Sequence, residues 1–169
     1  MVQRDSADPI AYQRSARTEV RFWAILALGI VFTYGGFTID PQSNCSSGGE
    51  CAPWLVPLAT LLGLGAIAIG LGTLIANPRR GCRYDAARGE LVWWQNRTLL
   101  DPGNEGRIDP AEIARIRIIR DSDYTEVYVY DRAGERLPWL DSEVIPWPYE
   151  AWADRVIERW PHVELVAEG

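Results

Sequence analysis

The chain has 169 residues, of which 47% are hydrophobic and 24% are charged, and this is not the composition of a disordered protein. Its formal net charge is -6, and all its basic residues are Arg. Nucleic-acid binding requires clustered positive charge facing phosphates, so this balance argues against a nucleic-acid partner. The mean hydropathy of -0.13 averages a strongly apolar part and a polar part, which indicates two regions in different solvents.

Residues 1–21 are polar and contain four Arg side chains that precede the first apolar run. No small-residue cleavage site follows them, so we expect this cytoplasmic N-terminal segment to stay attached. Within it, residues 10–20 have poorly spaced apolar positions. A short interfacial helix and a mobile tail both fit this spacing, and we favour the tail.

Two runs without charge, residues 22–39 and 54–76, are long enough to cross a bilayer as helices of about 27 Å and about 35 Å. The connecting loop, residues 40–53, is short and contains no Arg, whereas Arg residues flank both outer ends. The positive-inside rule therefore predicts a multi-pass membrane protein with both termini cytoplasmic and the loop external.

Cys45 and Cys51 both lie in the external loop, whereas Cys82 lies on the reducing side. We favour a disulfide between Cys45 and Cys51 over free thiols. Metal binding is the weakest alternative, because the loop adds only two carboxylates and no His.

Small residues recur at helical spacing in both apolar runs, and such residues let helix backbones approach closely. The expected packing contact lies either within the hairpin or between copies of the chain. Neither run contains an ionisable residue, so a transport path is not expected. The glycines assigned to helix packing are Gly29, Gly36, Gly63, Gly65, Gly70 and Gly72.

Residues 81–166 show turn signals and short β-prone runs, which predict a small antiparallel sheet. Residues 113–120 fit a helix or a strand, and we favour one helical turn, begun by a capping box at Asp109, followed by a strand. Residues 100–107 are expected to form a loop. The other expected strands are residues 82–86, 90–95, 125–130 and 136–140, the last as an edge strand because of Pro138.

Residues 149–160 have the clearest helical pattern of the polar part, between Pro148 and Pro161. The apolar face of this helix is expected to pack on the sheet as part of the domain core rather than to form a ligand site. Its residues are Tyr149, Trp152, Val156, Ile157 and Trp160.

This order of elements, a two-helix hairpin, then short antiparallel strands with an Asp-Pro-Ala-Glu-Ile turn, then one amphipathic helix, resembles small bacterial membrane proteins with a pleckstrin-homology-like (PH-like) domain. The resemblance covers residues 22 to about 166. It implies an α+β fold in which the C-terminal helix caps a small antiparallel sheet or barrel, and it implies a location in the bacterial cytoplasmic (inner) membrane with this domain on the cytoplasmic side.

The sequence offers few groups for catalysis. His162, the single His, follows a helix-ending Pro, and Asp121 and Asp123 fit a turn better than a metal site. No phosphate-binding glycine loop, Cys/His cluster or activated nucleophile is recognisable. We therefore expect no catalytic, cofactor or metal residue and no enzymatic activity.

Two functions fit this sequence. In the first, the hairpin anchors a PH-like domain that binds a partner protein near the membrane. In the second, the chain is an accessory subunit that docks on a larger membrane complex through its glycine-rich helices, and a homo-oligomer is a third possible association. Binding of anionic lipid is not expected, because the domain is acidic and Arg115 and Arg117 are expected to be solvated or paired with Glu126.

Overall fold

The computed structural model describes residues 9–45 and 49–169, and these divide into two compact units. The first is a helical unit, Ala16–Asn77. The second, called the sheet unit below, comprises the described part of Met1–Ser15 together with Pro78–Gly169. The fold is thus mixed α and β, with the two kinds of structure in separate units.

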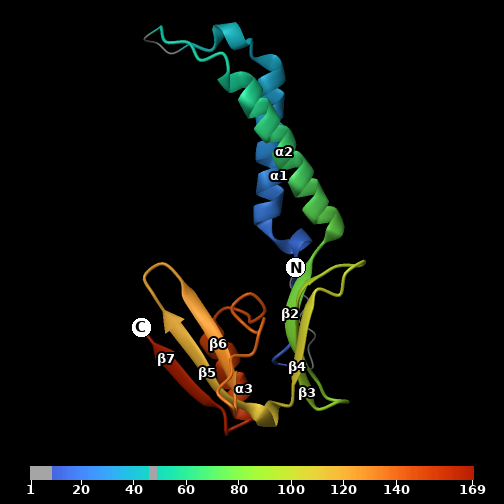
Figure 1. Ribbon diagram of the computed structural model, residues 1–169, viewed down its shortest axis with the longest axis vertical. Coiled ribbons are helices and arrows are strands. Elements are labelled where there is room, and N and C mark those ends of the chain that lie inside the picture. The colour runs from blue at the N-terminus through green and yellow to red at the C-terminus, as the bar shows by residue number, and fades with distance from the viewer. Residues whose placement is uncertain (1–8, 46–48) are drawn as a thin grey trace. The chain divides into compact units, whose positions relative to one another are not determined.

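The helical unit is an antiparallel hairpin of α1 (Val20–Thr38) and α2 (Leu55–Ala76), with the short 3-10 turns η1 (Ala16–Thr18) and η2 (Pro41–Ser43) (Figure 1). Both helices are long and apolar enough to cross a membrane. Only 6% of the most apolar window of α1 and 17% of that of α2 is buried inside the protein. Most of their large apolar side chains therefore face outward, which suits a lipid environment better than water.

The two helices touch through glycines. A Cβ atom added at Gly63 would lie 2.7 Å from the Thr33 backbone nitrogen and 2.8 Å from the Gly29 carbonyl oxygen. Gly29 and Gly36 face α2 at similarly short distances, and Gly70 faces Leu26. The absence of side chains at these four positions is what lets the helix backbones meet.

Gly65 and Gly72 do not take part in this contact, because a Cβ atom at either position would have no neighbour within 4 Å. The six glycines therefore divide into four at the α1–α2 contact and two on an outward face of α2. The spacing of small residues could not separate these two faces, because both run along the same helix.

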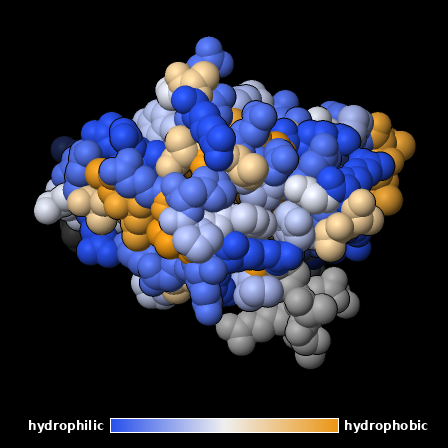
Figure 2. All heavy atoms as spheres, turned by 90° about the horizontal axis from the view of Figure 1, so that it is seen from below, coloured by the Kyte–Doolittle hydropathy of each residue, from blue (hydrophilic) through white to orange (hydrophobic). Residues whose placement is uncertain are grey.

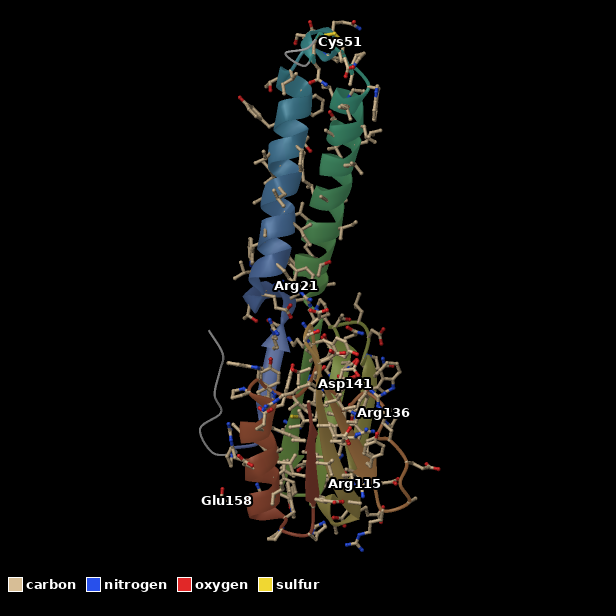
Figure 3. The ribbon with its side chains drawn as sticks, turned by 90° about the vertical axis from the view of Figure 1, so that its left-hand side faces the viewer. Arg21, Cys51, Arg115, Arg136, Asp141 and Glu158 are labelled. Carbon is tan, nitrogen blue, oxygen red and sulfur yellow. A yellow bond between two sulfur atoms is a disulfide. The ribbon has the colours of Figure 1, made fainter. Side chains whose placement is uncertain are left out.

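Arg17 holds the end of the hairpin opposite the loop. Its Nε donates to the Leu74 carbonyl oxygen at 2.9 Å, and its backbone N–H donates to Asn77 Oδ1 at 3.3 Å. Asn77 ends α2 in the left-handed conformation, and its own N–H caps the Thr73 carbonyl. A cation placed on the terminal carbonyls of a helix stabilises that end. Figure 3 shows Arg21 and Cys51 at opposite ends of the hairpin.

The sheet unit contains two sheets. The first is antiparallel throughout, with β1 (Tyr12–Ser15), β2 (Arg79–Asp85), β3 (Glu90–Arg97) and β4 (Asn104–Ile108) in that order. The second has the order β6–β5–β7, with β5 (Ile113–Arg120) antiparallel to β6 (Thr125–Asp131) and parallel to β7 (Glu164–Glu168). The 3-10 turn η3 (Pro110–Glu112) joins the sheets, and α3 (Tyr149–Arg159) precedes β7 (Figure 1).

One hydrophobic core serves both sheets, and its largest fully buried side chains include Trp93 of β3 and Trp152 of α3. Ile10, just before β1, is also fully buried in this core. By contrast, the face of the molecule shown in Figure 2 is mostly hydrophilic, with hydrophobic residues in small separate patches. The described residues form two separate sheets and no closed barrel.

Several elements differ from the sequence expectations. Residues 12–15 form strand β1 instead of a mobile tail, because Gly81 leaves room for it: a Cβ atom there would lie 2.0 Å from the Tyr12 carbonyl oxygen. Strand β4 occupies part of the expected loop, residues 100–107. The expected strand 136–140 is reduced to a single bridge between Tyr130 and Arg136.

The sequence expectation for residues 109–120 is confirmed. The expected turn followed by a strand is present as η3 and β5.

The C-terminal helix is followed by a further strand that the sequence did not indicate. Strand β7 pairs with β5 through backbone hydrogen bonds and has only three apolar residues between two Glu side chains. A pattern this short gives little period-two signal.

Candidate functional site

The outer face of the first sheet carries a surface pocket of about 180 Å³ with three arginines, called the arginine pocket below. Its guanidinium groups belong to Arg79 and Arg83 of β2 and Arg97 of β3. Arg79 and Arg97 are direct register partners. The other lining residues are Ala11, Tyr12, Gln13, Cys82 and Trp94.

Arg97 is already engaged within the sheet. It forms an ion pair with Glu105 of β4, and its guanidinium carbon lies 5.0 Å from the centre of the Trp94 ring. Glu105 also pairs with Arg107 at 2.8 Å. Arg97 is thereby held over Trp94 as a fixed wall of the pocket.

Arg79 and Arg83 are both exposed, and among the described residues no carboxylate oxygen lies within 4 Å of either guanidinium. Two such groups beside a buried indole ring present the donors that a planar anion requires, because a guanidinium can pair with a carboxylate through two parallel hydrogen bonds. The pocket is thus suited to binding.

The arginines of the second sheet are arranged differently, because each has a carboxylate partner. Arg115 pairs with Glu164 at 2.8 Å and Arg117 pairs with Glu168 at 2.6 Å, both across the β5–β7 pairing, and Arg120 pairs with Glu150 of α3. Glu126, the partner expected from the sequence, instead accepts a hydrogen bond from the Tyr128 hydroxyl.

These pairs shift the proton affinities of their members. The hydrogen bond from Arg117 lowers the pKa of Glu168, and the hydrogen bond from Arg120 lowers the pKa of Glu150. Hydrogen bonds to Glu168 and Tyr130 raise the pKa of Arg117. The positive charge of these three arginines is therefore balanced locally by carboxylates.

A polar cluster joins the end of β3 to the long segment before α3. Gln95 Nε2 donates to Asp141 Oδ1 at 3.0 Å and to the Trp139 carbonyl at 3.3 Å, and Arg80 of β2 pairs with Glu143. Partial burial raises the pKa of Asp141. In Figure 3, Asp141 and Arg115 lie at different levels along the unit. The cluster fixes residues 139–143 against the arginine-bearing end of the first sheet.

The expected site residues outside the pocket have structural positions. The Sγ atoms of Cys45 and Cys51 lie 1.97 Å apart, a disulfide distance, as the sequence predicted for this pair. On α3, Trp152 and Val156 are buried in the core, whereas Tyr149, Ile157 and, just after the helix, Trp160 pack against it while partly exposed.

The side chains that the sequence assigned to turns also lie in turns. Asp121 Oδ1 accepts from the Ser122 N–H, and a ring nitrogen of His162 lies 3.1 Å from the Pro110 carbonyl oxygen. Within residues 9–45 and 49–169, no three His, Cys, Asp or Glu side chains gather in a group that could hold a metal ion.

A scan against protein-family models, a search of curated proteins and a search of solved structures each found no match for this chain. Its function must therefore be argued from its own residues. The arginine pocket was missed by sequence reasoning because its three arginines lie up to 18 positions apart and are brought together by the β2–β3 register. One available signal was the alternation of Arg79, Gly81 and Arg83 along one strand.

Proposed function

We propose that this protein is a non-enzymatic integral protein of the bacterial inner membrane that presents a binding domain to the cytoplasm. The observation that supports the anchor is the outward exposure of apolar side chains over most of α1 and α2. Water would penalise such a surface by about 25 cal/mol for each Å² of apolar area, whereas hydrocarbon would not.

The arginine pocket is the proposed binding site, and its proposed occupant is a carboxylate side chain of a partner protein. Arg79 and Arg83 supply the charge, and Trp94 supplies an apolar floor. Because the whole chain carries a net charge of -6, an anionic bilayer would attract the domain weakly.

The PH-like resemblance is not needed for this proposal. A PH-like domain remains our interpretation of residues 81–166, but β1 precedes the hairpin and β7 follows the helix, and neither strand belongs to the pattern on which the resemblance rests.

Topology reporters test the anchor. A reporter fused after Gly169 is expected to be active only as a cytoplasmic reporter, and one inserted near Gly48 only as an external reporter, because Arg residues flank both helices and none lies in the loop. A C-terminal reporter active outside the membrane would contradict the proposed orientation.

Charge removal tests the pocket. A photo-crosslinking residue placed at Gln13 of the full chain is expected to capture one partner protein in cells. The double variant Arg79→Gln, Arg83→Gln is expected to reduce this product at least about tenfold, because two charge-assisted contacts are lost. The matched control is Arg88→Gln, Arg132→Gln, which removes two exposed arginines outside the pocket and should leave the product unchanged.

Two outcomes would contradict the proposed site. A product that is insensitive to the loss of Arg79 and Arg83 would show that binding occurs elsewhere. Crosslinking to lipid alone would show that the pocket binds a lipid headgroup and not a partner protein.

The second candidate function is an accessory subunit that docks through its membrane helices, and the open positions of Gly65 and Gly72 on α2 favour it. A stoichiometric membrane partner that is retained after deletion of residues 81–169 would support this candidate over the pocket.

A further inference from the structure

The turn between β3 and β4 exposes two consecutive leucines. Leu99 is 91% exposed and Leu100 is 98% exposed. Single exposed leucines are ordinary on protein surfaces, but two adjacent leucines that are almost fully exposed form a concentrated apolar protrusion. Residues 98–103 are called the leucine turn below.

Hydrogen bonds fix this turn in its exposed form. Thr98 Oγ1 accepts from the backbone N–H groups of Leu100 and Asp101, at 3.2 Å and 3.0 Å. The Thr98 N–H donates to the Asp101 carbonyl at 2.8 Å, and the Gly103 N–H donates to Asp101 Oδ1 at 2.9 Å. Gly103 has a φ of +67°, which glycine adopts without strain. The leucines are therefore presented by a turn that four internal hydrogen bonds hold closed.

The turn lies at the end of the first sheet from which the chain continues into the helical hairpin. It follows Arg97, whose register partner is Arg79, and Arg79 comes three residues after Ala76, the last residue of α2. Three residues span at most about 10 Å. Arg79 also pairs with Ser15, whose next residue begins the helical unit. Both covalent connections to the hairpin therefore leave the sheet at this end.

Other side chains at this end suit the boundary between lipid and water. Trp139 is 48% exposed, and its carbonyl is tied to Gln95 near the end of β3. Arg79 is also exposed, and its register partner is Arg97 at the same end of β3. Trp and Arg are favoured at this boundary, where an apolar body and a polar group are solvated separately.

The carboxylates nearby are already occupied, which lowers the cost of bringing this end close to lipid. Glu105 pairs with Arg97 and Arg107, Glu143 pairs with Arg80, and Asp101 accepts within the turn. At the opposite end of the same sheet, the β2–β3 turn exposes Ala86, Ala87 and Arg88 and no large apolar side chain.

From these observations we propose that the leucine turn inserts Leu99 and Leu100 into the interfacial region of the bilayer that holds the hairpin. This inference rests on the proposed membrane anchor. The insertion gives the sheet unit a third attachment to the membrane besides its two covalent connections, and it restricts the orientations in which the arginine pocket meets a partner. The occupant is the acyl region of the lipid and not a charged headgroup.

Depth-dependent fluorescence quenching tests this proposal on the full chain. The protein is placed in vesicles of phosphatidylethanolamine and phosphatidylglycerol with a nitroxide on the acyl chains. A polarity-sensitive fluorophore is attached at Leu100→Cys, at Ala87→Cys in the opposite turn, or at Ile69→Cys on the exposed face of α2. The native Cys82 is buried, and the other two cysteines are bonded to each other.

We expect quenching and blue-shifted emission at positions 100 and 69 and neither effect at position 87. Quenching at 69 without quenching at 100 would overturn the leucine-turn proposal and leave the anchor intact. Absence of quenching at 69 would overturn the anchor itself. A blue shift at 100 without quenching would show that a protein surface, and not lipid, covers the turn.

A second set of variants separates insertion from mere proximity. With the fluorophore at Pro102→Cys, the double variant Leu99→Ser, Leu100→Ser is expected to lose the quenching, whereas Leu99→Met, Leu100→Met should retain it. Both leucines are almost fully exposed, so the fold of the sheet unit does not depend on them. Equal quenching in the serine and methionine variants would overturn the proposal.

Discussion

Replacing Trp152 with Ala is expected to lower the free energy of unfolding of the sheet unit by about 3–5 kcal/mol, because it removes a large side chain from a closed core. Trp152 is 1% exposed and belongs to the core that both sheets share. Small domains are stable by only about 5–15 kcal/mol, so this single change removes a large part of that stability.

Amide hydrogen exchange of β5 and β6 in the full chain measures the effect. Each 1.4 kcal/mol lost accelerates exchange through global opening about tenfold, so protection should fall by roughly 100-fold or more. Trp147→Ala is the matched control, because that Trp is 81% exposed and its loss should change protection little.

Trp152→Phe separates the volume of the side chain from its N–H group. Among the described residues, Trp152 Nε1 is buried and has no hydrogen-bond partner. Phe retains most of the apolar volume and removes an unsatisfied donor, so its cost should be well below that of Ala. Equal losses of protection in the Ala and Phe variants would contradict this account of the core.

The features that the sequence predicted well are those that depend on local periodicity. The two apolar runs correspond to α1 and α2 within two residues at each end, and the face of residues 149–160 packs as α3 on the core. Asp109 accepts from the Ala111 N–H and begins η3, as the capping pattern indicated. Each of these signals lies within a few residues of its own element.

The features that the sequence missed depend on pairing between distant segments. Strand β1 lies next to β2, although the whole hairpin separates them in the sequence, and β7 lies next to β5 across more than 40 residues. Short strands of this kind are stabilised by backbone hydrogen bonds to an existing sheet edge. Their side-chain pattern therefore gives little indication of the pairing.

The candidate site was unpredictable for the same reason. Arg79 and Arg97 come together through the β2–β3 register. The alternation of Arg79, Gly81 and Arg83 was only a weak signal of this, because a bulge between Arg79 and Gly81 interrupts the regular strand. The sequence instead drew attention to Arg115 and Arg117, which the structure pairs with Glu164 and Glu168 of the unrecognised strand β7. Missing that strand therefore also meant missing the partners of these arginines.

Replacing Gly63 with Leu is expected to separate α1 from α2, because the new side chain has no space to occupy. Its first carbon alone would lie 2.6 Å from Thr33 Oγ1, 2.7 Å from the Thr33 nitrogen and 2.8 Å from the Gly29 oxygen. Two of these three atoms belong to the backbone and cannot rotate away. Forcing even small groups into a packed contact costs about 1–3 kcal/mol, and a Leu side chain adds three further carbons.

Gly65→Leu is the matched control on the same helix, because a Cβ atom at that position meets nothing within 4 Å. In a monomeric hairpin it should be tolerated, and the better helix propensity of Leu over Gly should offset any cost. The measurement is energy transfer between fluorophores at the exposed positions Ile30 and Leu64 during titration of the detergent-solubilised chain with dodecyl sulfate.

Gly63→Leu is expected to lose the transfer at a lower dodecyl sulfate fraction than the wild type, and Gly65→Leu at an unchanged fraction. Equal midpoints for Gly63→Leu and the wild type would show that α1 and α2 are not held by the glycine contact. A lowered midpoint for Gly65→Leu would instead place a second helix contact on the outward face of α2, as expected for docking between chains, because that substitution meets no atom within the hairpin.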